Sequence, residues 1–341
     1  MKVGWNLGNT LDALPHFTVK MHVGDYETSW GNPKTDKEMI DDIKKAGFNI
    51  VRIPVTWTGH IGDAPDYRID IDWFQRVEAV IDYVLDNNMQ AIINLHHEDW
   101  YTPTSGNFEA AADKLEKLWT QIAVYFSGYD SQLIFEGLNE PRLIGTEYEW
   151  NGGNVDSWDI VNRLNKIFVR AIRNTGGLNK TRKLMIPTYA ASCCESAINA
   201  FIIPEGEHDN IIVSVHAYIP YDFALNGDGT SEWSSENKKD TYDIDHLIDL
   251  LYTRFTSNGI KVIISEFGAV DKNNKNDRTQ WVNYFISQAS QKNIACIWWD
   301  NCSFTGDGEL FGLYDRNSKK WVHPEIVQAM MEAVNHQSLA M

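Results

Sequence analysis

The sequence has few cysteines and no long hydrophobic run. Its four cysteines, Cys193, Cys194, Cys296 and Cys302, form no Cys-x-x-Cys pair, so nothing resembles a zinc site. We expect no metal and no other cofactor. We also expect free thiols, with a bridge between Cys296 and Cys302 as an alternative. No apolar run approaches the roughly 18 residues of a membrane span, which argues against a membrane protein.

Basic residues are also scarce. The 30 lysines and arginines are outnumbered by 47 aspartates and glutamates, which gives a formal net charge of −17. Nucleic acids and anionic membranes are held chiefly through lysine and arginine, so we expect neither as a partner. A neutral ligand suits this surface better.

A secretory leader is missing as well, because the first residues, Met1 to Trp5, have none of its features. We expect a secreted or extracellular protein whose leader is absent from this chain, with a cytoplasmic location as the alternative. The sequence leaves open whether other modules, absent from this chain, flank it.

Apolar, β-branched runs are present, and they alternate with amphipathic stretches of helical period. This alternation predicts parallel strands joined by helices. The predicted strands are Val3 to Leu7, Asn49 to Pro54, Gln90 to Leu95, Leu133 to Gly137, Lys183 to Pro187, Ile211 to His216, Lys261 to Glu266 and Ala295 to Trp299. The predicted helices include Lys37 to Ala46, Ile71 to Asn87, Ala111 to Phe126, Ser157 to Asn174, Ile244 to Asn258, Asp277 to Gln291 and one after Pro324.

Eight such units without a break in composition predict one (β/α)8 TIM barrel of the α/β class, a single domain over residues 1–341. A polar segment rich in Gly, Ser and Asn predicts an extended loop at about residues 219–240. The alternative is an open doubly wound sheet, which usually carries a Gly-rich phosphate-binding turn after its first strand. Here that turn reads Gly8-Asn9-Thr10-Leu11-Asp12, which is not that motif.

Polar residues at the carboxyl ends of barrel strands are the candidates for function, because those ends face the active site. Two of them are glutamates, Glu140 and Glu266. Glycoside cleavage needs one carboxyl group that donates a proton and a second that attacks or stabilises the sugar cation. The remaining candidates, for substrate binding, are Asn9, Asp12, Arg52, His96, His97, Asn139, His216, Tyr218 and Trp299.

A single glutamate at a strand end is more often a salt-bridge or helix-cap residue, so the motif around Glu140 decides. Leu133-Ile134-Phe135-Glu136-Gly137-Leu138-Asn139-Glu140-Pro141 resembles the signature of glycoside hydrolase family 5, and the chain resembles the endo-β-1,4-glucanases of that family over nearly its whole length. The other matching segments are Gly4 to Asp12, Thr28 to Pro33, Phe48 to Trp57, Asn94 to His97, Val215 to Tyr218, Ile264 to Gly268 and Trp298 to Asn301.

The resemblance implies that Glu140 is the acid/base, that Glu266 is the nucleophile and that Asn139 binds the sugar 2-hydroxyl. Arg52 and Tyr218 are the natural groups to keep Glu266 ionised. The pKa of Glu140 should be raised by burial or by the charge of Glu266, so that it holds a proton until the leaving group needs it.

Histidines suggest a metal site as an alternative, because His96, His97 and His216 could bind one ion together with an acidic residue. Adjacent strand residues point to opposite sides, however, so we expect His96 and His97 not to share an ion unless the strand has already ended. Sugar contact for one of them and a structural role for the other are the better interpretation.

Aromatic residues are abundant, with 13 Trp, 14 Tyr and 14 Phe, and some should line a binding surface. Trp299 is expected to stack on a sugar face. Trp30 and Trp233 are further candidate platforms, followed by Trp57 and Trp100.

The combined interpretation is a retaining endo-β-1,4-glucanase that acts on a polysaccharide substrate, a β-glucan of the cellulose, mixed-linkage or xyloglucan type. Action on mannan or xylan is the nearest alternative, because those polymers share the β-1,4 linkage. A non-catalytic carbohydrate-binding barrel is the alternative from another class.

Overall fold

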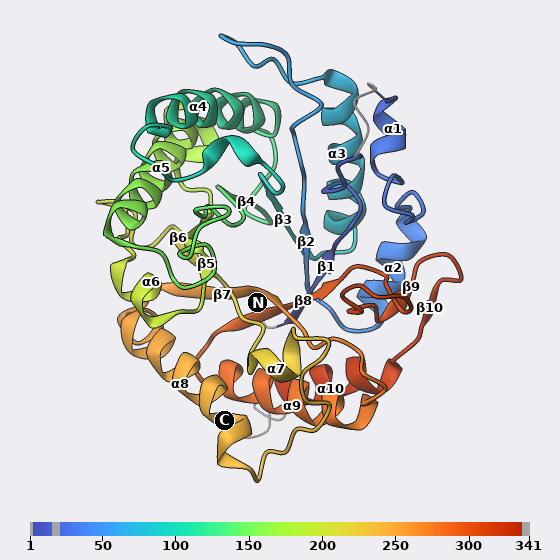
Figure 1. The fold of residues 1–341 in the computed structure, drawn as a ribbon. Coiled ribbons are helices and arrows are strands. Elements are labelled where there is room, and N and C mark those ends of the chain that lie inside the picture. Colours follow the sequence, from blue (N-terminus) through green and yellow to red (C-terminus); the bar gives the residue numbers. More distant parts are fainter. Residues whose placement is uncertain (1–2, 16–20, 336–341) are drawn as a thin grey trace.

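Eight parallel strands close into a barrel in the order β1 to β8, in the computed structural model, which describes residues 3–15 and 21–335 (Figure 1). The strands are β1 (Val3–Leu7), β2 (Ile50–Ile53), β3 (Gln90–Asn94), β4 (Leu133–Glu136), β5 (Leu184–Ser192), β6 (Ile211–His216), β7 (Lys261–Phe267) and β8 (Ala295–Asp300). The barrel is closed by pairing of β1 with β8. The predicted TIM barrel is therefore confirmed.

Helices surround the barrel in the ring seen in Figure 1. They are α1 (Val23–Tyr26), α2 (Lys37–Lys45), α3 (Ile71–Leu85), α4 (Phe108–Tyr125), α5 (Val155–Asn174), α6 (Glu195–Ala200), α7 (Tyr221–Ala224), α8 (Lys238–Arg254), α9 (Lys275–Gln291) and α10 (Pro324–Asn335). Side chains of Asp36, Asp70 and Asn154 cap the amino ends of α2, α3 and α5 by accepting main-chain N–H bonds.

Side chains that point into the barrel form a buried apolar layer near its base. Since strand residues alternate between faces, the next inward position lies two residues further on. The layer consists of Ile50, Ile92, Ile134, Met185, Ile212, Ile263, Ala295 and Ile297. Two residues beyond Ile50, Ile92 and Ile134 the inward residues are polar: Arg52, Asn94 and Glu136. The apolar layer is thus the floor of a polar chamber.

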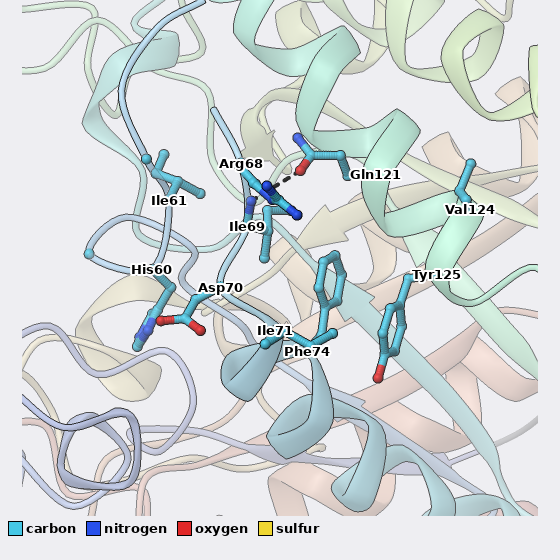
Figure 2. A pocket seen from close by; sticks show the side chains of 12 residues that line it. His60, Ile61, Arg68, Ile69, Asp70, Ile71, Phe74, Gln121, Val124 and Tyr125 are labelled. Carbon is cyan, nitrogen blue, oxygen red and sulfur yellow. Dashed lines mark hydrogen bonds between the residues drawn. The ribbon is translucent and has the colours of Figure 1, made fainter. Parts of the chain in front are cut away.

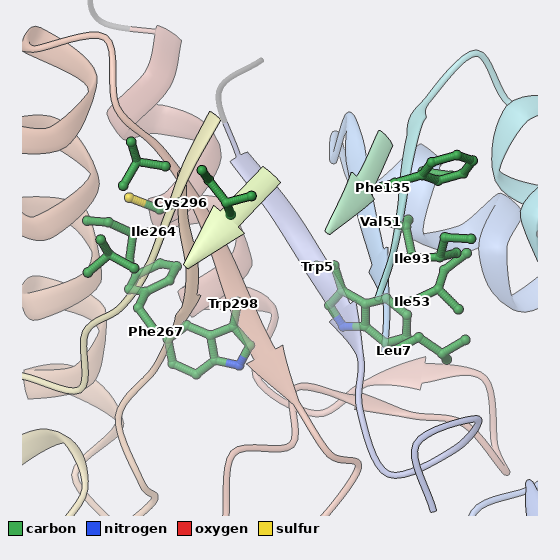
Figure 3. Close-up of a cluster of buried hydrophobic side chains, with 14 of the residues drawn as sticks. Trp5, Leu7, Val51, Ile53, Ile93, Phe135, Ile264, Phe267, Cys296 and Trp298 are labelled. Atoms are coloured by element: carbon green, nitrogen blue, oxygen red, sulfur yellow. The ribbon is translucent and has the colours of Figure 1, made fainter. Parts of the chain in front are cut away.

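Residues on the outer face of the strands pack against the helices instead. Figure 3 shows part of this set, including Trp5, Phe135, Phe267 and Trp298. All four are fully buried. This shell between strands and helices holds most of the hydrophobic core.

The segment predicted as an extended loop at residues 219–240 contains more structure than expected. It holds α7, and α8 already begins at Lys238. Lys272 Nζ fastens the segment by donating to the main-chain oxygens of Asp222, Phe223 and Thr230. A short antiparallel pair, β9 (Tyr314–Asp315) and β10 (Lys320–Trp321), follows the barrel strands.

One alternative that the sequence left open is resolved by the structure. All four cysteines are free, so Cys296 and Cys302 are not bridged. Among the described residues, none of the helices is both long and apolar enough to cross a lipid bilayer.

Candidate active site

An irregularity in β7 places Glu266 inside the barrel mouth. The pairing of β6 with β7 shifts between Val215 and His216, so that His216 pairs with Glu266 after Val215 has paired with Ile264. Both residues between Ile264 and Phe267 therefore face inward: the Ser265 hydroxyl contacts that of Ser214, and Glu266 contacts Arg52. A bulge of this kind re-aims a side chain without breaking the sheet.

Glu140 faces Glu266 from the loop after β4. His216 Nδ1 lies 2.8 Å from Oε1 of Glu140 and 3.5 Å from Oε2 of Glu266, so it bridges the two carboxyl groups. The ligand atoms of these three side chains all lie within 4.8 Å of one another. The sequence separates the two glutamates widely, and the barrel brings their carboxyl groups together.

Arg52 lies fully buried beneath this pair, where its guanidinium group binds four side chains. Its Nη1 donates to Glu266 Oε1 over 2.6 Å, its Nε to Glu136 Oε2 over 2.6 Å, and its Nη2 to Asn139 Oδ1 over 2.7 Å. Because a guanidinium group only donates, the Asn139 carbonyl must face Arg52, and its NH2 group is left for the mouth. Asn139 is thereby oriented as a hydrogen-bond donor.

Asn6 fastens the same network to the neighbouring strands. Its Oδ1 accepts from Arg52 Nη1 over 3.1 Å, while its Nδ2 donates to the main-chain oxygens of Ser265, Ile297 and Trp298. Four residues of this chamber, Asn6, Glu136, Ser214 and Ser265, were not predicted from the sequence. They could have been found by counting inward positions along each strand, because each lies two residues beyond a small or apolar inward residue.

Burial raises the pKa of both Glu140 and Glu266. At Glu266 burial raises the pKa and outweighs the charge of Arg52, which lowers it, while the charge of Glu140 raises it further. The raised pKa predicted for Glu140 is confirmed. Arg52 and Tyr218 do contact Glu266 as expected, with the Tyr218 hydroxyl donating over 3.0 Å, yet the net shift of the Glu266 pKa is upward.

His96 and His97 both border the pocket at the mouth, as the sequence allowed for a strand that had already ended. The reason is that β3 ends at Asn94, before them. The Asn94 carbonyl accepts from Val55 N, so its NH2 group donates to His96 Nδ1 over 3.1 Å. His96 Nε2 then carries the proton, as burial lowers the pKa of His96 well below its usual range.

Two groups of possible metal ligands lie at this mouth: Asp12 with His96 and His97, and the two glutamates with His216. In the first group, His96 Nδ1 is taken by Asn94, and both oxygens of Asp12 accept main-chain N–H bonds from Asn9 and Thr10. These bonds account for the arrangement of the first group, and the absence of a metal stays a prediction.

The pocket above the carboxyl pair has a volume of about 730 Å³. It is lined by both glutamates, His96, His97, Asn139, His216, Tyr218 and Trp299, which were all predicted, and also by Trp150, Asn151, Ser192, Cys193, Cys194, Tyr221 and Glu309, which were not. Trp150 and Tyr221 are 58% and 60% exposed, so they offer open ring faces on the wall. Trp150 lies in the loop after β4 and Tyr221 begins the short helix α7, and the strand pattern determines the path of neither segment.

Trp299 is placed as predicted, since its ring borders the pocket and stacks against His96 at 5.7 Å between ring centroids. Trp30 lies next to His97, 5.5 Å between centroids, outside the pocket lining. Trp233 and Trp57 were wrongly predicted as platforms, because both are buried: Trp233 is 3% exposed and packs on Tyr284.

The turn after β1 lies beside the pocket and does not line it. Asp12 is fully buried and accepts hydrogen bonds from Asn9 N and Thr10 N, so its predicted sugar contact is corrected to a role in shaping this turn. Burial raises the pKa of Asp12 to about 6. Asn9 is partly exposed, and its sugar contact stays a prediction. Trp100 packs against the core, and its indole N–H donates to Glu98.

A second hollow, of about 850 Å³, lies on the outer wall between the loop after β2 and helices α3 and α4 (Figure 2). Its lining includes Ile71, Phe74, Val124 and Tyr125, and Gln121 donates and accepts hydrogen bonds that hold the loop there. It contains one carboxylate, Asp70, and this caps α3. Two facing carboxyl groups, which acid–base and nucleophilic catalysis require, lie at the barrel mouth instead.

A TIM barrel whose mouth holds two facing glutamates, an orienting asparagine and a ring beside them is the architecture of a glycoside hydrolase. The model of the cellulase family, glycosyl hydrolase family 5, matches residues 16–305. The chain belongs to this family.

Individual relatives agree with that assignment. Endoglucanase B of Neocallimastix patriciarum is 45% identical over 338 residues, which are 98% of this chain and 71% of that protein. A GH5-4 broad specificity endoglucanase from Ruminococcus champanellensis, solved with cellotriose, superimposes with a TM-score of 0.93 at 46% identity, covering 97% of this chain and 95% of the other. A mutant lichenase from Caldicellulosiruptor sp. F32 in complex with cellotetraose gives 0.94 at 44% identity, covering 98% and 93%.

Proposed function

We propose that this glycoside hydrolase is a retaining endo-β-1,4-glucanase, with Glu140 as acid/base and Glu266 as nucleophile. The observation that carries the proposal is the carboxyl pair, whose ligand oxygens lie within 4.8 Å of each other. Retaining enzymes hold their carboxyl groups about 5 to 5.5 Å apart, whereas inverting enzymes leave about 6.5 to 9.5 Å for a water molecule. The space between Glu140 and Glu266 is too small for that water.

In the first step, the Glu266 carboxylate attacks the anomeric carbon while Glu140 donates its proton to the leaving oxygen. The bond from the anomeric carbon to that oxygen breaks, and an ester to Glu266 forms. Arg52 and Tyr218 bind the Glu266 carboxylate and so fix the direction of its attacking oxygen. The Asn139 NH2 group is oriented toward the sugar 2-hydroxyl.

In the second step, Glu140 takes a proton from water, and the resulting hydroxide attacks the anomeric carbon and releases Glu266. The negative charge on Glu266 is absent in the ester, which makes Glu140 easier to ionise at this stage. His216 stays neutral throughout, because burial lowers its pKa to about 4. It therefore bridges the carboxyl groups without adding a charge.

The substrate class follows from the wall and from the relatives. Exposed rings of Trp150 and Tyr221, with Trp299 beside the reacting groups, suit the apolar faces of successive glucose units. The solved relatives bind cellotriose and cellotetraose, and one of them is a lichenase. A cellulose-like, mixed-linkage or xyloglucan chain is therefore the proposed substrate, and such polymers place the enzyme outside the cell.

The test is product release from carboxymethylcellulose, lichenan, xyloglucan, xylan and mannan, with the anomer of the first product followed by proton NMR. We expect β-anomers from the glucans. Initial α-anomers would overturn retention, and hydrolysis confined to mannan or xylan would overturn the glucan assignment. Binding to these polymers without hydrolysis would support the non-catalytic barrel instead.

The acid side of the pH profile should report Glu266. Protonated Glu266 cannot attack, and burial raises its pKa above the ordinary 4.5, so kcat/KM should already fall as pH drops through values above 4.5. Tyr218→Phe removes a hydrogen bond to the ionised form and should move this limb further upward. Tyr242→Phe, on an exposed ring of α8, is the control and should leave it in place. A limb below pH 4.5, or one unmoved in Tyr218→Phe, would contradict this assignment.

Trp299→Ala should weaken binding of a soluble cello-oligosaccharide by about 2- to 10-fold, because an aromatic stacking contact is worth roughly 0.5 to 1.5 kcal/mol. Trp233→Phe is a suitable control, since that ring is buried away from the pocket. Isothermal titration with Glu266→Gln, which should bind without cleaving, measures both. Equal affinities for the two variants would argue against Trp299 as a platform.

A further inference from the structure

Glu140 is contacted on its outer side by an arginine that the steps above do not use. Arg142 lies two residues further along the loop after β4. Its Nη1 is 3.5 Å from Oε2 of Glu140 and donates to the main-chain oxygen of the same residue over 3.3 Å. Since Oε1 of Glu140 faces His216, the carboxyl group lies between a neutral imidazole and a guanidinium.

The guanidinium group of Arg142 is itself held in place. Its Nε donates to Glu149 Oε1 over 3.0 Å, and Oε2 of Glu149 accepts from Gly145 N over 2.8 Å. Its carbon atom lies 4.5 Å from the centroid of a Trp150 ring. The side chains of Arg142 and Glu149 are 26% and 19% exposed, so this is a fixed, partly buried ion pair.

We propose that Arg142 is a positioning residue that stabilises the ionised form of Glu140, and that Glu149 limits this effect by pairing with the same guanidinium. The inference rests on the proposed function, because it assigns a task within that two-step reaction. A cation beside Glu140 favours transfer of its proton to the leaving oxygen in the first step. It also favours the ionised carboxylate that must accept a proton from water in the second.

Several charged or titratable groups surround Glu140, and the effects of Arg142 and Glu149 can be separated from those of the others. The others are Arg52 on β2, Tyr101 in the loop after β3, His216 on β6, Tyr218 after β6, Glu266 on β7 and Glu309 after β8. Burial has the largest effect on Glu140 and raises its pKa. The charges of Arg142 and, more weakly, Arg52 lower that pKa, and the charge of Glu149 raises it. Arg142 and Glu149 lie outside the Arg52 network, so either can be exchanged without disturbing the nucleophile.

The experiment is the pH dependence of kcat/KM on a soluble mixed-linkage β-glucan, whose alkaline limb reports loss of the proton from Glu140. Arg142→Met should move this limb to higher pH, and Glu149→Gln should move it to lower pH. The comparison is made one pH unit above the midpoint of the unaltered enzyme's alkaline limb, with each activity expressed relative to its own profile's maximum. There Arg142→Met should be about threefold more active than the unaltered enzyme and Glu149→Gln about threefold less active, as for a partly exposed ion pair. Arg142→Lys keeps the charge and should return the limb toward its original position.

Arg163→Met is the control, because Arg163 lies on the outside of α5 and pairs with Asp159. A purely structural role for Arg142 predicts a lower rate with an unmoved limb, and that result would overturn the inference, as would limbs displaced in the same direction. If Arg142→Met does not fold, Glu149→Gln decides alone, and a limb that stays in place refutes the inference. Failure of the unaltered protein to hydrolyse any glucan would instead refute the proposed function itself.

Discussion

Glu266→Gln should lower kcat on a soluble β-glucan by about 10⁴-fold or more while the barrel stays folded. The amide has nearly the shape of the carboxylate: its oxygen can accept from Arg52 Nη1, and its NH2 group can donate to the Tyr218 hydroxyl oxygen. It cannot form a stable ester with the sugar. Reducing-sugar release measures the loss, and far-ultraviolet circular dichroism checks the fold.

The partner substitution, Glu140→Gln, should give a different signature. Hydrolysis of the polymer should fall by roughly 10² to 10⁴ fold, because the leaving oxygen receives no proton. An aryl glycoside with a good leaving group needs no such help in the first step, so the ester to Glu266 should accumulate and be visible by mass spectrometry. Glu116→Gln, on the exposed face of α4, is the matched control. Near-normal turnover of the polymer by either active-site variant would refute the assignment.

Arg52→Met should lower the free energy of unfolding by about 3 to 5 kcal/mol. It leaves Glu136, a fully buried carboxylate, without its ion-pair partner, and removing one member of a buried pair is far costlier than losing an exposed pair. Urea denaturation followed by tryptophan fluorescence measures the difference.

Arg170→Met provides the comparison, because Arg170 and Glu116 form an exposed pair with side chains 56% and 42% accessible. That substitution should cost about 1 kcal/mol or less. Adding Glu136→Gln to Arg52→Met should recover part of the lost stability, since it removes the stranded charge. Equal losses for Arg52→Met and Arg170→Met would mean that the buried network contributes little.

The barrel and its carboxyl pair were predictable because they depend on patterns that can be recognised along the sequence itself. Apolar runs such as Ile211 to His216 are long enough to mark a strand, and the rule that strand ends meet at one rim brings Glu140 and Glu266 together. The strand ends, by contrast, were less certain. β5 runs on to Ser192 through a register shift after Pro187, beyond the predicted end.

What the sequence could not provide is the direction of side chains where the backbone departs from regular geometry. Alternation alone would place Ser265 and Glu266 on opposite faces of β7, and the bulge turns both inward. The same holds at the end of β3, where His96 and His97 meet at the pocket. Local periodicity carries no information about such departures.

The packing of loops against distant parts of the chain could not be predicted from the sequence either. Trp233 and Trp150 both lie in polar loops, yet the first is 3% exposed and the second 58% exposed. What separates them is the partner each loop meets: Trp233 packs on Tyr284 of α9, whereas Trp150 meets the guanidinium group of Arg142. Neither partner is adjacent in the sequence.

The contacts of Asn6 determine when, during its synthesis, the chain can become active. Its side chain belongs to the first strand, and its acceptors on Ser265, Ile297 and Trp298 belong to the last two. The Asn6 NH2 group therefore lacks these acceptors until almost the whole barrel has been synthesised. The nucleophile gains its alignment only once β8 is in place, so a chain that ends before β8 should carry both glutamates and still be inert.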